Sequence, residues 1–163
     1  MTTGLLRGAL AGAAGTTALN AAGYLDMAVR GRPASNAPQD LVERAAEDAG
    51  VHVPGDERTR ANRLQGLGPL VGAGVGIAVG ALAGLLHHAL ARRGRELRPA
   101  VEVALIGGVA MALADVPLKA LGISDPRTWS AKDWASDIVP HLVYGTVTRA
   151  ALRRPGTARR RPL

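Results

Sequence analysis

The chain contains no cysteine and very few aromatic residues: its 163 residues include two Trp, two Tyr and no Phe. Without cysteine, disulfides, thiol nucleophiles and thiolate metal sites are excluded. Soluble domains of this size usually fill their cores with aromatic and long aliphatic side chains, so the shortage of aromatics argues against a water-soluble core. The sequence also lacks a phosphate-binding loop and an arrangement suited to nucleophilic catalysis. We therefore predict no catalytic, cofactor-binding or metal-ligating residues, and we do not expect an enzyme.

The residues that are abundant are small and apolar. The sequence is 47% hydrophobic, mainly Ala, Val and Leu, and it contains 21 Gly. Small residues suit helices in lipid, where close approach of two backbones replaces hydrophobic collapse as the source of attraction. The length allows one domain. The composition therefore predicts an all-α integral membrane bundle.

Four apolar stretches predict transmembrane helices, and they lie at about residues 4–24, 66–90, 100–121 and 134–152. The second is the clearest, because 25 residues without a charge can cross a hydrocarbon core of about 30 Å. The third is interrupted by Glu102, Asp115 and Lys119, so it is plausible only in a bundle whose polar residues face inward. The first stretch is also compatible with a cleaved signal peptide. Residues 1–152 would form one membrane domain, followed by a basic tail at 153–163.

The basic residues give the orientation. The net charge of +7 is concentrated at Arg92–Arg98 and in the C-terminal arginines, directly beside apolar segments. With both termini inside, eleven basic residues lie on the cytoplasmic side and nine outside, and the dense inner loop and tail favour this orientation. We therefore predict a multi-pass protein of the bacterial cytoplasmic membrane. Anionic lipid is the expected partner of the inner loop and tail, and no nucleic acid is expected.

Two polar segments carry local helix signals. In the polar loop at 30–65, Asn36, Pro38 and Gln39 resemble a helix start with a capping box, and Gly50 is a suitable stop. The apolar stripe of this helix consists of Leu41, Val42, Ala45, Ala46 and Ala49. This predicts a short amphipathic helix, lying on the bilayer or the bundle or else solvated in the loop.

The start of the last helix is also marked. Ser130 and Asp133 form a capping-box pattern, so this helix is expected to begin near Ala131. Trp129 and Trp134 flank that start, where tryptophan typically lies at the depth of the lipid headgroups.

A glycine occurs at every fourth residue through the second span. The series is Gly68, Gly72, Gly76, Gly80 and Gly84, and a shorter one, Gly4, Gly8 and Gly12, runs through the first span. Spacing of four keeps these glycines near one helix face, where another backbone can approach closely. The pattern predicts helix–helix packing within the chain or between copies.

Polar residues form a candidate cluster in the last two spans. Asp137, His141, Tyr144 and Thr148 share one face of the last helix, and Asp115 and Lys119 are spaced for an i, i+4 ion pair. Pro117 and Pro140 interrupt the helices at this depth and free backbone carbonyls. Asn20 and Asp26 could join the cluster from the first helix.

This cluster has two interpretations. It could hold a cation, a proton or a small polar ligand, or it could be a structural network satisfied within the protein. A metal site at Asp115, Asp137 and His141 has acceptable spacing but contains only one histidine, which disfavours it.

The C-terminal third contains a series of short motifs: Gly107-Gly108, Asp115-Val116-Pro117, Leu121-Gly122, Trp134 and the run from Asp137 to Gly145. With these motifs, and with Asp26-Met27 after the first span, the chain resembles small bacterial inner-membrane proteins of the YagU-like type. The resemblance implies a four-helix inner-membrane protein in which Asp137 and His141 lie at corresponding places. It implies no particular molecular activity.

The leading hypothesis is a structural or accessory membrane bundle that self-associates through its glycine-rich faces. A permeation or transport element that uses Asp115, Lys119, Asp137 and His141 is the alternative. An intramembrane enzyme acting on lipid, with His141 as the base, is the third.

Overall fold

The computed structural model describes residues 2–153, so the predicted basic tail lies outside the described residues except for Arg153. Within this range the chain is all-helical and forms no strand. The elements are α1 (Thr2–Arg30), α2 (Ala37–Asp48), α3 (Glu57–Arg92), α4 (Pro99–Ala120), the short 3-10 helix η1 (Pro126–Thr128) and α5 (Ala131–Leu152).

Local sequence signals explain most of the helix ends. Ser130 and Asp133 form the capping box predicted at the start of α5, with both reciprocal hydrogen bonds present. Gly50 follows α2 with φ of +72°, a conformation that glycine adopts without the steric cost of a Cβ. Asn36 does precede α2, but its side chain makes no capping hydrogen bond, so the capping box predicted there was wrong. Asn36 has helical backbone angles, whereas a side-chain cap usually requires an extended residue at that position.

The polar loop predicted at residues 30–65 ends earlier in the structure, where residues 31–56 connect α1 to α3. α3 begins at Glu57, nine residues before the predicted span, because Asp56 caps it by accepting a hydrogen bond of 2.8 Å from the amide of Thr59. α1 likewise continues to Arg30. α2 packs on the early part of α3, and a Cβ added to Gly68 would lie 2.9 Å from the carbonyl carbon of Pro38.

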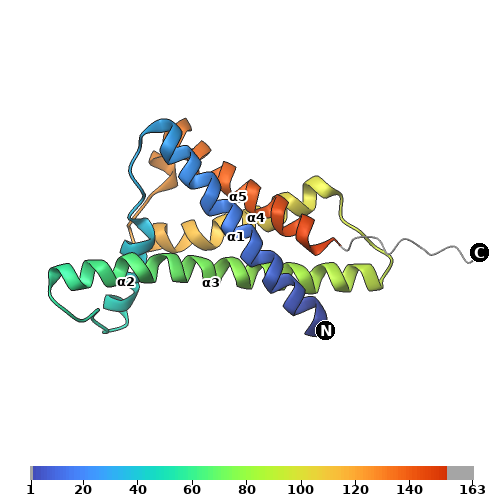
Figure 1. The fold of residues 1–163 in the computed structure, drawn as a ribbon, viewed down its shortest axis with the longest axis horizontal. Coiled ribbons are helices and arrows are strands. Elements are labelled where there is room, and N and C mark those ends of the chain that lie inside the picture. The colour runs from blue at the N-terminus through green and yellow to red at the C-terminus, as the bar shows by residue number, and fades with distance from the viewer. Residues whose placement is uncertain (1, 154–163) are drawn as a thin grey trace, which may run out of the picture.

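The four long helices run alternately in opposite directions between two ends of the molecule (Figure 1). We call one the basic end, formed by the start of α1, the α3–α4 connection and the end of α5. The other is the mixed-charge end, formed by the end of α1, α2, the start of α3 and the α4–α5 connection. Both described chain ends therefore lie at the basic end.

α1 and α3 cross by direct contact of their backbones, a region we call the α1–α3 crossing. A Cβ added to Gly80 would lie 2.6 Å from the amide nitrogen of Gly12, and one added to Gly84 would lie 2.6 Å from the Cα of Gly8. Both contacts are with main-chain atoms, which cannot rotate away as a side chain can. The crossing thus requires glycine on both helices.

α5 closes the bundle on two sides. Gly107 of α4 approaches the carbonyl of His141, and Gly15 of α1 packs against Tyr144 and Thr148. The core is small and is centred on Tyr144, whose side chain is 1% exposed, together with Val79, Ile106 and Ala110. Few large side chains are buried because glycine and alanine occupy most of the interfaces.

Among the described residues, two helices are long and apolar enough to cross a membrane, namely α3 and α4. Only 22% and 17% of their most apolar windows are buried in the protein. The hydrophobic core helix of a soluble protein would be mostly buried, so these two helices fit a membrane protein better. α1 and α5 fall below the same criterion of apolarity.

Candidate functional site

The predicted polar cluster separates into two groups in the structure. His141 lies 2.8 Å from the carbonyl oxygen of Asp137 and 3.1 Å from its Oδ1, both measured from Nδ1. Asp115 on α4 lies beside this pair. The helix spacing of four residues on α5 therefore brings Asp137 and His141 together, and packing of α4 on α5 adds Asp115.

Tyr144 and Thr148 form the second group, at the junction of α1, α3 and α5. The hydroxyl of Tyr144 donates a hydrogen bond of 2.5 Å to the carbonyl of Gly76. Thr148 is fully buried against Gly15. These two residues share a face with His141 in sequence, but they point toward the helix crossing and hold α5 against it.

Lys119 does not form the predicted i, i+4 ion pair with Asp115. Its nearest carboxylate among the described residues is Asp125, at 4.0 Å. Asp125 is held mainly by Arg127, and the hydrogen bonds from this guanidinium lower the pKa of Asp125 to about 2. Lys119 lies in the last turn of α4, where its long side chain can reach the following loop instead of turning back toward Asp115.

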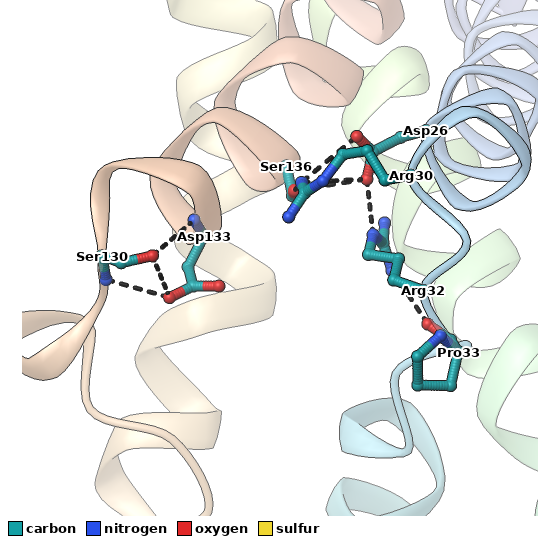
Figure 2. A network of polar contacts seen from close by, with 7 residues as sticks. All are labelled: Asp26, Arg30, Arg32, Pro33, Ser130, Asp133 and Ser136. Carbon is teal, nitrogen blue, oxygen red and sulfur yellow. Dashed lines mark hydrogen bonds and ion pairs between the residues drawn. The ribbon is translucent and has the colours of Figure 1, made fainter.

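Asp26 belongs to a network at the mixed-charge end and not to the polar cluster (Figure 2). It accepts hydrogen bonds of 2.5 Å from Nε of Arg32 and 3.2 Å from the hydroxyl of Ser136, and Arg30 contacts both Asp26 and Ser136. The hydrogen bond from Arg32, followed by that from Arg30, lowers the pKa of Asp26. This network joins the end of α1 to α5.

A second network lies near the basic end, and the sequence interpretation missed it. Glu102 of α4 accepts a hydrogen bond of 2.9 Å from Nε of Arg149 on α5, and its other oxygen lies 3.0 Å from Nδ1 of His87 on α3. The side chains of Glu102 and Arg149 are only 12% and 14% exposed. In the sequence, Glu102 appeared only as an interruption of the third span. The only sequence signal for this network was a single acidic residue near the start of an apolar helix. An acidic residue at such a place usually has a basic partner.

An open cavity of about 610 Å³ adjoins Glu102 at the basic end. Its walls come from α1, α3, the α3–α4 connection, α4 and α5. Five arginines line it: Arg7, Arg92, Arg95, Arg149 and Arg153. Glu96 and Glu102 also line the cavity, so the five arginines leave an excess of positive charge around it.

Within residues 2–153, no group of three or more His, Cys, Asp or Glu side chains is placed to hold a metal ion. Asp137 keeps one buried carboxylate oxygen, Oδ2, without a hydrogen-bond partner in the described part of the chain.

No family model, curated protein or solved structure matches this chain. The resemblance of its C-terminal third to YagU-like proteins therefore stays a prediction.

Proposed function

We propose that this chain is a structural or accessory membrane protein of the bacterial cytoplasmic membrane, in which α1, α3, α4 and α5 all cross the bilayer. The observation that carries the proposal is the distribution of large apolar side chains, which point outward from all four long helices. Among those at least 44% exposed are Leu6, Leu10, Leu70, Leu82, Leu113, Val116, Val139 and Leu142. In water, so much exposed apolar surface would be unfavourable and prone to aggregation, whereas lipid tails accommodate it.

The packing of α1 and α5 supports four spans instead of two. α1 contacts α3 backbone to backbone from Gly4 to Gly12, opposite residues deep within the apolar part of α3. α5 similarly contacts α4 along Val103 to Gly107. A helix that touches a lipid-embedded helix so closely must lie at the same depth, so both would lie in the bilayer with it.

The internal pairing of the polar residues supports a structural role over catalysis. Tyr144 bonds to Gly76, Asp137 to His141, and Glu102 to both His87 and Arg149. Each of these contacts satisfies groups that would be costly to leave alone in lipid. We expect the role to be exerted through contacts with lipid or with other proteins.

We also propose that the protein self-associates. The glycine surface free for this contact is smaller than the full glycine series of the sequence. Gly76, Gly80 and Gly84 are occupied by α1 within the same chain, whereas Gly72 of α3 and Gly108 of α4 are exposed and have open space around them. These exposed glycines are where a second copy could approach closely. Replacing Gly108 with Leu should then abolish crosslinked dimers in membranes while leaving the monomer folded, and unchanged crosslinking would remove Gly108 from the interface.

The topology can be mapped directly because the chain has no cysteine. Single-cysteine variants Thr3→Cys, Arg93→Cys and Val51→Cys are labelled in intact cells with a membrane-impermeant thiol reagent. Four spans with both termini inside predict labelling of Val51→Cys alone. If only α3 and α4 cross, Thr3→Cys is labelled as well. If the protein is released by alkaline washing of the membranes, the integral membrane assignment is wrong.

A permeation or transport element remains the second candidate because Asp137 has a buried oxygen without a described partner, close to Asp115 and His141. Such an oxygen could receive a cation, a proton or a small polar solute. Thermal stability of Asp115→Asn and His141→Gln in detergent distinguishes the two roles. A Tm lowered by several degrees supports a structural network. An unchanged or higher Tm would mean that the wild-type side chains do not stabilise the fold, which supports transport.

A further inference from the structure

We propose that the cavity at the basic end binds the headgroup of an anionic phospholipid, with the start of one acyl chain lying between α3 and α4. This inference rests on the proposed location of the protein in the bilayer. It assigns anionic lipid to one defined site, and not to a general attraction by the basic loop and tail.

Two carboxylates, Glu96 and Glu102, line the cavity together with the five arginines, so the positive charges are only partly compensated within the described chain. Arg149 is paired with Glu102, but no carboxylate in residues 2–153 lies within 4.0 Å of Arg7, Arg92, Arg95 or Arg153. These four arginines are contributed by the beginning of α1, the end of α3, the α3–α4 connection and the residue after α5. Guanidinium groups that converge from several segments match the oxygens of a phosphodiester, which accept hydrogen bonds in pairs.

The mixed-charge end provides the contrast. With the last turn of α4 and the first turn of α5 included, it holds nine basic and nine acidic residues. The basic ones are Arg30, Arg32, Arg44, Arg58, Arg60, Arg63, Lys119, Arg127 and Lys132, and the acidic ones are Asp26, Asp40, Glu43, Glu47, Asp48, Asp56, Glu57, Asp125 and Asp133. Several are directly paired: Arg30 and Arg32 with Asp26, Arg60 with Glu43 and Glu47, and Arg127 with Asp125. An anion would gain little there, because the arginines already have partners. Of the arginines that line the cavity at the basic end, only Arg149 has a carboxylate within 4.0 Å in residues 2–153, so an external anion would provide the missing partner.

An apolar surface leads away from the cavity and points to a lipid instead of free phosphate. A shallow hollow of about 30 Å³ shares His87, Leu90, Leu97 and Glu102 with the cavity and continues to Leu86, Leu105 and Ile106. It has room only for the start of an acyl chain. Leu86 and Leu105, which are 51% and 49% exposed, extend the apolar path along the outside of α3 and α4. Inorganic phosphate could use the arginines but would gain nothing from this surface.

The test compares two double variants with equal loss of charge at the same end. Arg7→Gln/Arg92→Gln removes two arginines that line the cavity, and Arg93→Gln/Arg98→Gln removes two that lie nearby but do not line it. The full chain, purified in neutral detergent, is titrated with phosphatidylglycerol, and binding is followed by native mass spectrometry. Phosphatidylcholine, glycerophosphoglycerol without acyl chains, and inorganic phosphate are the comparison probes. Thermal stability without lipid verifies that each variant is folded.

We expect the cavity variant to bind phosphatidylglycerol at least about tenfold more weakly than the wild type, and the control variant to stay within about threefold. The three comparison probes should bind weakly to every protein. Equal losses in both variants would mean diffuse surface attraction and would overturn the proposal. Equal binding of phosphate and phosphatidylglycerol would assign the cavity to a free anion instead of a lipid. Failure of the wild type to bind phosphatidylglycerol, in a protein that the cysteine labelling places in the membrane, would reject this inference alone.

Discussion

The α1–α3 crossing and the basic end differ in what lies at their centre: closely packed backbones at the crossing, and a cavity lined by arginines at the basic end. At the crossing, glycines let two backbones meet, and the atoms nearest to Gly8, Gly12 and Gly80 are main-chain atoms of the other helix. At the basic end, arginines from several segments surround a cavity of about 610 Å³, and most of them have no described acidic partner. The contacts of the crossing are made within the chain, whereas four of the five arginines that line the cavity have no carboxylate within 4.0 Å in residues 2–153. Stability should therefore depend mainly on the crossing, and ligand binding mainly on the basic end.

The largest expected effect is at the crossing. Gly80→Leu places a branched side chain against the backbone of α1, which should destabilise the protein by about 3 kcal/mol or more, or lower Tm by roughly 6–12 °C. Gly74→Leu is the matched control, because Gly74 lies on the same helix, is exposed and has open space around it. Thermal unfolding in detergent measures both. Equal loss of stability in the two variants would mean that α1 does not cross α3 at Gly80.

The second-largest effect is expected at Glu102, which pairs with Arg149 and His87 at the basic end. Glu102→Ala leaves Arg149 and His87 without their carboxylate in a half-buried position, and should cost about 1–3 kcal/mol. Glu96→Ala, at the same end of the molecule but without an ion pair in the described chain, should change Tm very little. If Glu102→Ala is as stable as the wild type, Glu102 does not link α3, α4 and α5.

A smaller effect is expected from the hydrogen bond that fastens α5 to the crossing. Tyr144→Phe removes the donor to the carbonyl of Gly76 while keeping the ring in place, and should cost about 1 kcal/mol. The chain's other tyrosine, Tyr24, is 66% exposed, so Tyr24→Phe is a control that should have no effect. A larger loss in the Tyr24 variant than in the Tyr144 variant would contradict the placement of α5.

The smallest effect is expected at the exposed pair of Asp125 and Arg127. Because the pKa of Asp125 is lowered to about 2 from a usual value near 3.9, its contribution to stability is present above about pH 4 and is lost as the pH falls toward 2. The pair is exposed to solvent, so Asp125→Asn should shift Tm at pH 7 by less than Tyr144→Phe does. Thermal unfolding of both proteins between pH 7 and pH 3 measures this. A Tm loss as large as that of Glu102→Ala would show that exposed and half-buried pairs contribute alike.

The sequence determined the features that depend on near neighbours along the chain. The helical class, the start of α5 at Ser130 and Asp133, the end of α2 at Gly50 and the two apolar helices α3 and α4 all follow from capping, glycine conformation and apolar runs. These signals are local because a helix end is satisfied by residues within one turn. The early start of α3 at Glu57 was missed, although Asp56 offered the same capping chemistry there.

Only the tertiary structure decided which neighbour each face meets. Spacing of four residues puts Asp115 and Lys119 on one helix face, yet the Lys119 side chain reaches Asp125 instead. The same spacing could not tell that Gly80 is covered by α1 while Gly72 stays open, or that Glu102 meets both Arg149 and His87. Helical periodicity fixes the direction of a side chain relative to its own helix axis. The partner depends on how distant helices cross, and that information is spread over the whole chain.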